Sequence, residues 1–142
     1  MKIKIKLLNR NGKIPTKAHK TDACYDVYAA SVLFDEENQT VVYGLGFATE
    51  IPVGYKGIIV PRSSFTKTNW VMQNTPAQVD ASYRGEWIVK FKCVDYAVEA
   101  PFKENERIAQ IFFEKVLDIE FEEVDTLTNT ERGSGGFGSS GK

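Results

Sequence analysis

The sequence predicts a single all-β domain, and three observations support this. Apolar and polar residues alternate with a period of two in several short segments, which is typical of half-buried strands. Glycine, proline and other turn-forming residues separate these segments at regular spacing. No stretch of useful length shows the 3.6-residue period of an amphipathic helix. Many short strands at such spacing favour a β sandwich or jelly roll.

Length and composition agree with one intracellular domain. The chain has 142 residues, of which 42% are hydrophobic, enough for a core without disulfides or a structural metal. Its net charge of -1 excludes a general nucleic-acid or anionic-membrane surface. Cys24, Cys93 and a single histidine, His19, which we expect to be exposed, exclude a disulfide framework and a zinc site. With no signal sequence or spanning segment, we expect an intracellular protein in the cytoplasm, or in the nucleus or the interior of a host cell.

The first part of the chain contains most of the expected strands. Residues 2–7 place isoleucine and leucine on one side and lysine on the other, which indicates a half-buried strand with a solvated lysine face. Residues 23–30 are rich in β-forming residues and predict a strand that contains Asp26. Glycines and a proline then separate three further expected strands at residues 41–43, 47–49 and 58–60.

The middle of the chain predicts a short helix and a hairpin. Pro61-Arg62-Ser63-Ser64 is expected to open a helix over residues 65–69, with Ser63 or Ser64 as N-cap and free N–H groups for an anion. Residues 70–72 and 87–93 read as two strands joined by a turn at 80–85, which places Asp80 at the mouth of the hairpin. An isolated Asp-x-x-Tyr-x-Gly is most often only a turn. After Pro101, residues 107–116 predict another strand.

Residues 128–142 differ in kind from the β domain, to which we assign residues 1–127. Five of the eleven glycines fall in residues 133–141, so the segment cannot fold alone. The simple interpretation is a flexible linker or tag remnant. Arg132 and Phe137 favour an arm that closes over a base and its phosphates. Residues 126–142, fully extended, would span on the order of 55 Å, enough to reach a neighbouring subunit.

Arginine is concentrated in a few stretches, whereas lysine carries the general surface charge. Four of the five arginines, Arg62, Arg84, Arg107 and Arg132, lie in the central and terminal stretches. The planar guanidinium suits bidentate contacts to phosphate or carboxylate oxygens. Together these stretches indicate a local phosphate site on a chain of nearly neutral charge.

Five stretches together resemble the five ordered motifs of the trimeric dUTPases (deoxyuridine triphosphate nucleotidohydrolases). They are Ala23–Ala29, Pro61–Ser64, Asn74–Gly85, Arg107–Gln110 and Arg132–Gly141. The resemblance implies a β jelly roll and a homotrimer whose three sites are each built from several subunits. It also implies Mg²⁺-dependent hydrolysis of dUTP to dUMP and pyrophosphate, which limits uracil incorporation into DNA and supplies dUMP for thymidylate synthesis.

The resemblance also assigns roles around the nucleoside. It implies that Asp80 positions and polarises the water that attacks the α-phosphorus. Tyr83 would pack under the deoxyribose and exclude a 2'-hydroxyl. Main-chain groups around Asn74 and Ile88 would read uracil, and Phe137 would stack on the base.

For the triphosphate, the resemblance implies a second set of contacts. The phosphate ligands would be Arg62, Ser63, Ser64 and Gln110, joined from the arm by Arg132, Gly138, Ser139 and Ser140. Asp26 would hold Mg²⁺ through its water shell and not directly. We expect Arg107 to form a structural ion pair and Arg84 to be a charge at the rim.

Two alternative functions remain open, and the sequence departs from the usual dUTPase motifs at three places. Cys24, Ala77 and Asn105-Glu106 replace residues that are commonly Gly, Gly and Gly-Asp in the family, which affects local loop geometry. Deoxycytidine triphosphate deaminases share the fold, but they need a glutamate where this chain has residues 89–91, Val-Lys-Phe. A jelly-roll module that binds a nucleotide without hydrolysing it is the second alternative.

Overall fold

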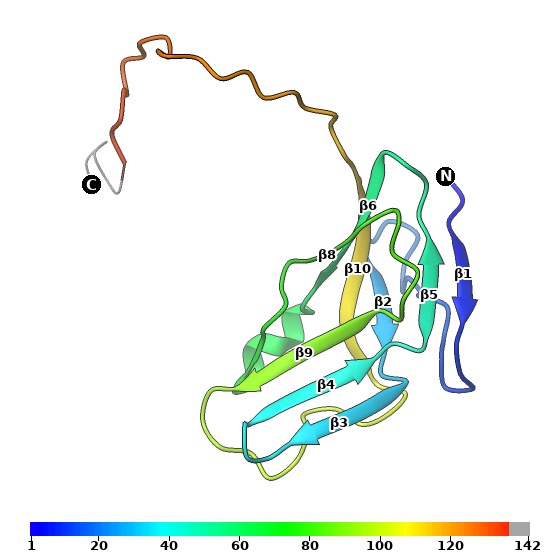
Figure 1. Cartoon of the computed structure of the whole chain (residues 1–142). Coiled ribbons are helices and arrows are strands. Elements are labelled where there is room, and N and C mark those ends of the chain that lie inside the picture. The colour runs from blue at the N-terminus through cyan, green and yellow to red at the C-terminus, as the bar shows by residue number, and fades with distance from the viewer. Residues whose placement is uncertain (137–142) are drawn as a thin grey trace.

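The computed structural model describes residues 1–136 and shows an all-β chain (Figure 1). Among these residues there are ten strands and one short 3-10 helix. The strands are β1 (Lys4–Leu7), β2 (Tyr25–Tyr28), β3 (Ser31–Asp35), β4 (Thr40–Gly44), β5 (Phe47–Glu50), β6 (Tyr55–Val60), β7 (Trp70–Met72), β8 (Ala77–Val79), β9 (Ile88–Cys93) and β10 (Arg107–Lys115). The helix η1 covers Ser63–Lys67. The predicted all-β jelly-roll class is confirmed.

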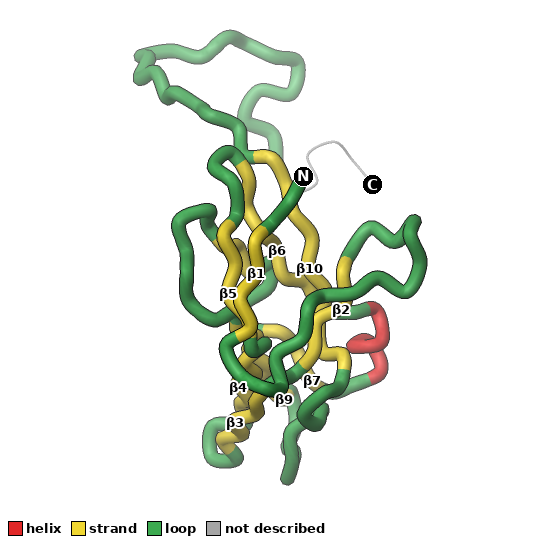
Figure 2. The backbone as a smooth tube through the Cα atoms, turned by 90° about the vertical axis from the view of Figure 1, so that its right-hand side faces the viewer, coloured by secondary structure: helices red, strands yellow, loops and turns green. Residues whose placement is uncertain are grey.

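The strands form three antiparallel sheets that enclose one core. Two sheets have four strands, in the orders β2-β10-β6-β8 and β3-β4-β9-β7, and β1 pairs with β5 in a third. Figure 2 shows β1, β5, β6 and β10 along the upper part of the molecule and β3, β4, β7 and β9 below them. One hydrophobic cluster contains Ile59 and Ile111 from the first large sheet and Val41, Val89 and Phe91 from the second. Burial of these apolar surfaces between the sheets stabilises the fold.

The period-two patterns place the expected side chains inside, with two local exceptions. In β9, Val89, Phe91 and Cys93 are buried and Lys90 is exposed, as predicted. In β10 both Ile108 and Ala109 are buried, because the register shifts between Arg107 and Ala109; such a bulge changes the face on which residues lie. In β1, Leu7 is 44% exposed, so the apolar side of that strand is only partly covered.

The predicted short helix is wrong in extent and in its cap. The structure has a 3-10 helix over Ser63–Lys67, and its N-cap is Arg62, without a side-chain capping hydrogen bond. Neither Ser63 nor Ser64 caps it. A five-residue 3-10 helix has too few aligned peptides for a strong dipole. The expected anion site at a helix N-terminus is therefore not formed in that way.

The central hairpin is confirmed as a strand pair but is more elaborate than predicted. β7 and β9 pair antiparallel, with Trp70 opposite Cys93. Between them the chain leaves this sheet, and β8 pairs with β6 in the other large sheet. The turn at 80–85 therefore follows β8 and leads back to β9. The sequence analysis missed β8 and also β3, an edge strand on which Val32 and Phe34 are only partly buried.

The described part of the C-terminal segment extends away from the sheets. Residues 116–136 contain no helix or strand, and Figure 1 shows them running from the end of β10 into solvent. A hydrogen bond from Val116 N to Gly54 O, 2.8 Å, marks the last contact of this kind with the sheets. Within residues 1–136 no helix is long and apolar enough to cross a bilayer.

Candidate active site

The excursion between β7 and β9 builds an open pocket of about 200 Å³. Asn74, Asp80, Tyr83 and Ile88, four residues singled out in the sequence, all line it. The other lining residues are Ile59, Ala77, Gln78, Val79, Glu86 and Trp87. The volume is below the roughly 300–1,000 Å³ of pockets that enclose a whole drug-sized ligand. It can therefore enclose only part of a ligand of that size.

Asn74 fixes one wall of this pocket with its side chain. Its Oδ1 accepts from the Lys90 amide at 2.9 Å, and its Nδ2 donates to the Ile88 carbonyl at 3.2 Å. This amide takes over the pairing with β9 at the point where β7 has ended at Met72. The Asn74 side chain is therefore engaged with the strand, and its two hydrogen bonds hold this wall in place.

Asp80 lies at the rim, directly after β8. The Asp80 carbonyl accepts from the Tyr83 amide at 3.1 Å, which closes a turn. Asp80 is exposed to solvent. Arg84 is exposed, as expected for a rim charge, but its guanidinium also donates to the carbonyls of Ala81 and Tyr83 at 2.6 and 2.9 Å. These bonds hold the loop that carries Asp80 in a compact conformation.

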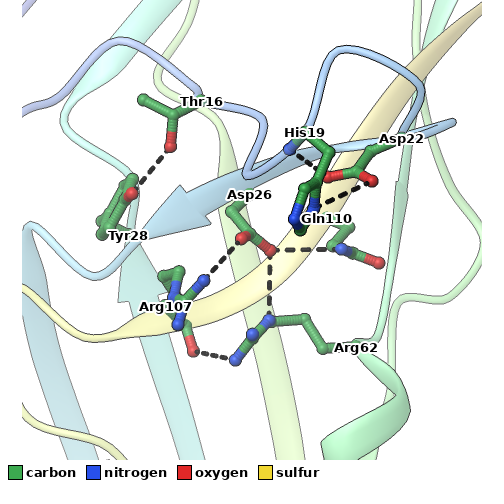
Figure 3. Close-up of polar contacts among 8 residues, drawn as sticks. All are labelled: Thr16, His19, Asp22, Asp26, Tyr28, Arg62, Arg107 and Gln110. Carbon is green, nitrogen blue, oxygen red and sulfur yellow. Dashed lines mark hydrogen bonds and ion pairs between the residues drawn. The ribbon is translucent and has the colours of Figure 1, made fainter.

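A second group of polar residues surrounds the buried carboxylate of Asp26 on β2 (Figure 3). Its oxygens accept from Arg62 Nε at 3.1 Å, from an Arg107 terminal nitrogen at 3.1 Å and from Gln110 Nε2 at 3.2 Å. We call these four residues the arginine cluster. The sheet order explains it, because β10 lies between β2 and β6 and Arg62 follows β6 by two residues. The predicted ion pair of Arg107 is confirmed.

The arginine cluster is preorganised to attract an anion. One carboxylate faces two guanidinium groups, so the cluster carries a formal charge of +1. The side chain of Arg107 is 48% exposed, whereas that of Arg62 is 23% exposed. Since each bond to Asp26 uses only one N–H, other donors of the planar forks stay available for phosphate oxygens.

The pocket and the arginine cluster have no residue in common. None of Asp26, Arg62 and Gln110 lines the pocket that contains Asp80. Ser63 and Ser64 are exposed on η1. Arg132 donates from Nε to the Gly135 carbonyl at 2.9 Å, inside the extended segment. Phe137, Gly138, Ser139 and Ser140 lie outside the described residues.

One polar residue of the loop was missed by the sequence analysis. Glu86 Oε1 accepts from the Gly46 amide at 2.7 Å, which ties the loop to the turn between β4 and β5. No sequence signal could have identified this bond, because its partner lies 40 residues away. Ala77, by contrast, is accommodated easily, since it pairs with Ile59 in β8 and is half-buried.

In the described residues the side chains do not form a direct magnesium site, and Asp26 is the carboxylate that could hold the ion through water. Among residues 1–136 no group of three or more His, Cys, Asp or Glu could bind a metal. Asp26 already accepts three hydrogen bonds, whereas a carboxylate offers about four positions. One position is left for a metal-bound water, the mode of binding that Mg²⁺ often adopts.

The fold and these two groups of residues define a jelly-roll protein with two arginines around a buried aspartate and an open, partly apolar pocket. The dUTPase family model matches residues 10–141, so the chain belongs to the dUTPase family. The deoxyuridine 5'-triphosphate nucleotidohydrolase of Nautilia profundicola is 40% identical over 144 residues, with all of both chains covered. That of Rhodococcus erythropolis is 38% identical and covers 99% of this chain and 87% of its own.

A solved dUTPase structure has the same fold as this chain. The G164S mutant of the Staphylococcus bacteriophage 80alpha dUTPase, with dUpNHpp, is similar with a TM-score of 0.85 and 27% identity. The similarity covers 99% of both chains. The expected family is thus confirmed by sequence and by structure.

Proposed function

We propose that this chain hydrolyses dUTP to dUMP and pyrophosphate, inside the cell, where nucleotides are made. The observation that supports it best is the convergence of Asn74, Asp80, Tyr83 and Ile88 on one pocket. Family membership and the names of the relatives point to the same reaction. A deaminase is disfavoured, because Val89 and Phe91 of β9 are buried and the exposed residue between them is Lys90.

In this proposal Asp80 orients the attacking water. Its exposed position at the pocket rim leaves the carboxylate free to accept a hydrogen bond from water. Carboxylates are weak bases at neutral pH. Positioning of the water in line with the α-phosphorus, together with neutralisation of phosphate charge, therefore supplies most of the acceleration.

The pocket holds the nucleoside. Main-chain donors and acceptors around Asn74 and Ile88 face the uracil edge, since the Asn74 amide is occupied by β9. The Tyr83 ring, which is 45% exposed, packs against the deoxyribose. A 2'-hydroxyl would meet an apolar ring face there and lose hydrogen bonds to water, which disfavours UTP.

The triphosphate binds at the arginine cluster. Arg62, Ser63, Ser64 and Gln110 donate to its oxygens, and Asp26 keeps Arg62 and Gln110 oriented. The arm of residues 128–142 then closes over the domain of residues 1–127. Arg132, Gly138, Ser139 and Ser140 join the phosphate contacts and Phe137 stacks on the base. Mg²⁺ would neutralise charge on the triphosphate, with Asp26 accepting from one of its waters.

A complete site needs more than one copy of the chain, and we propose a homotrimer. The nucleoside pocket and the arginine cluster have no residue in common. The extended segment also leaves apolar side chains in solvent, with Leu117, Ile119 and Phe121 exposed by 73, 63 and 93%. Exposure of this kind costs free energy unless another surface covers it.

Strand β1 has the features of a partner for that segment. The segment alternates apolar residues with Asp118, Glu120 and Glu122, and β1 alternates apolar residues with lysines. In the described residues only one edge of β1 is paired, with β5. An acidic strand from a second copy added at the other edge would match both the apolar and the charged faces.

The activity is tested by pyrophosphate release from dUTP in the presence of Mg²⁺, with UTP, dTTP and dCTP as controls. We expect turnover of dUTP in clear preference to the others. Release of ammonia from dCTP would indicate a deaminase. Binding of dUTP without any product would indicate a sensor.

Sharing of sites is tested by mixing two defective chains. Asp80→Asn damages the pocket and Arg62→Ala damages the arginine cluster. If a site takes its halves from different subunits, mixed trimers contain some sites with two intact halves. An equal mixture should then regain roughly a quarter of wild-type activity, because each half is drawn at random.

The matched control mixes Asp80→Asn with Tyr83→Ala, since both changes lie in the pocket. This mixture should show no more than the mean activity of the two separate variants, because no combination of them restores an intact pocket. If the first mixture also failed to regain activity, the halves would belong to one chain. Light scattering should give a mass three times the 16.0 kDa of one chain, and an active monomer would contradict the trimer.

A further inference from the structure

Tyr83 is held against its own loop at two points. Its amide donates to the Asp80 carbonyl at 3.1 Å, and its hydroxyl donates to the Glu86 carbonyl at 3.0 Å. The ring therefore turns back over residues 84–86 instead of projecting freely into solvent. Its position is decided by the path of those residues.

Gly85 leaves the space in which this ring lies. A Cβ atom built at Gly85 would come within 2.4 Å of Tyr83 Oη and 2.5 Å of Cζ, far inside van der Waals contact. The φ angle of Gly85 is not in the left-handed region that favours glycine, unlike those of Gly46 and Gly54. The backbone would therefore accept another residue, and only the Tyr83 ring excludes one.

Glu86 anchors the other side of the same arrangement. Its carbonyl accepts the Tyr83 hydroxyl, and its carboxylate accepts the Gly46 amide at 2.7 Å. The next residue is fixed as well, because Trp87 N donates to Phe47 O at 3.1 Å and Trp87 O accepts from Leu45 N at 2.9 Å. The Glu86 carboxylate packs closely on Gly44, where a Cβ would meet its Oε1 at 2.6 Å. The acceptor for Tyr83 is thereby connected to the rigid β4–β5 turn.

From these contacts we infer that Gly85 and Glu86 are specificity-determining positioning residues. They set the place of the Tyr83 ring, and through it the discrimination between deoxyribose and ribose. The inference rests on the proposed function, in which Tyr83 packs against the sugar. Gly85 does not line the pocket and acts through the ring, whereas Glu86 lines the pocket and also accepts the Tyr83 hydroxyl with its carbonyl.

Gly85→Ala is the direct test, measured as kcat/KM for dUTP and for UTP. The added methyl displaces the far end of the Tyr83 side chain, which can rotate, so the loop itself should survive. We expect the preference for dUTP to fall by about 10- to 100-fold, the range that a shaped apolar contact supplies against one hydroxyl. The lower preference should arise from a higher kcat/KM for UTP relative to dUTP, and not only from a lower kcat/KM for dUTP.

A double substitution separates this role from general damage to the loop. In a Tyr83→Ala background the ring is absent, so adding Gly85→Ala should leave the dUTP to UTP ratio unchanged. If Gly85→Ala altered the ratio equally with and without the ring, or left it unchanged in the wild-type background, the inference would be overturned. A thermal melt of each variant shows whether the fold is retained.

Glu86 is tested with a conservative pair. Glu86→Gln keeps an acceptor for the Gly46 amide and should retain most of the sugar preference, whereas Glu86→Ala should lose it. Glu50→Ala, which removes an exposed carboxylate paired with Lys4, is the control and should leave the ratio unchanged. Equal ratios for wild type and Glu86→Ala would remove Glu86 from this role. Failure of the wild-type protein itself to hydrolyse dUTP would refute the proposed function and is a separate result.

Discussion

The nucleoside pocket and the arginine cluster are built in different ways. Every residue singled out in the pocket comes from one continuous stretch of the chain, residues 74–88. The cluster joins residues that are 36, 81 and 84 positions from Asp26. The first depends on local turns and the second on the order of strands in a sheet.

This difference decides how each region responds to change. The pocket loop is secured by its own hydrogen bonds, together with the Glu86 anchor, so substitutions there alter chemistry or specificity while the sheets persist. The cluster is centred on a carboxylate only 6% exposed, and its bonds connect β2, β10 and the end of β6. Substitutions there should affect stability and activity together.

The largest effect is expected from Asp80→Asn in the pocket. Turnover of dUTP should fall by roughly 10² to 10⁴, the range for a positioned proton acceptor. A non-hydrolysable dUTP analogue should still bind, and the thermal melt should be unchanged. Steady-state kinetics measure the turnover, and calorimetric titration measures binding of the analogue. Asp95→Asn, on the exposed β9–β10 loop, is the matched control and should leave turnover unchanged. Unaltered turnover in Asp80→Asn would exclude Asp80 from the mechanism.

An intermediate effect is expected from Asp26→Asn in the cluster. The free energy of unfolding should fall by about 1–3 kcal/mol, because two guanidinium groups lose a charged acceptor while they are only partly exposed to water. Activity should fall as well, since Arg62 and Gln110 lose their orientation. Chemical denaturation gives the stability change.

The surface pair Lys4–Glu50 provides the comparison for Asp26. Its nitrogen–oxygen distance is 2.7 Å, but both side chains are largely exposed. Exposed pairs contribute little, so Glu50→Gln should leave the unfolding midpoint near that of wild type. Equal destabilisation by Glu50→Gln and Asp26→Asn would contradict the distinction between the buried cluster and the surface.

The smallest effect concerns Tyr43, which belongs to neither region. Burial raises the pKa of its hydroxyl to about 12, whereas an unfolded tyrosine has a pKa of about 10. The unfolded chain therefore releases this proton first, and stability falls as pH rises from about 10 to about 12. Below pH 10 the contribution is fully present.

Tyr43→Phe should flatten that alkaline part of the stability curve. At neutral pH the variant should be less stable, because Tyr43 Oη donates to the Phe102 carbonyl and accepts from its amide, both at 3.0 Å. Urea denaturation between pH 8 and 12 measures both effects. A slope identical to that of wild type would show that another group controls the alkaline transition.

Much of the fold was predictable because strand patterns are local. β2, β4, β5, β6, β7, β9 and β10 lie where alternation and turn residues indicated them. β3 and β8 were missed, and β8 has only three residues, too few to show a period. The helix was predicted too far along the chain, because the serines at residues 63–64 suggested an N-cap. In the structure these serines are the first residues of a 3-10 helix.

The candidate site was predictable to the extent that its residues are contiguous. Asp80 and Tyr83 could be singled out together as a turn motif, and their common pocket follows from that turn. The contacts of Asp26 with Arg62 and Gln110, and of Glu86 with Gly46, required the sheet order and the β4–β5 turn. The roles of the site residues in the reaction stay predictions.

The sequence by itself determined the all-β class, the family and the turn that carries Asp80, because each depends on residue types at short spacing. Only the tertiary structure decided that Asp26 accepts from two arginines and a glutamine, and that none of these residues lines the pocket. The reason is that hydrogen bonds between β2, β10 and β6 bring distant residues together, and no local pattern records which strands become neighbours.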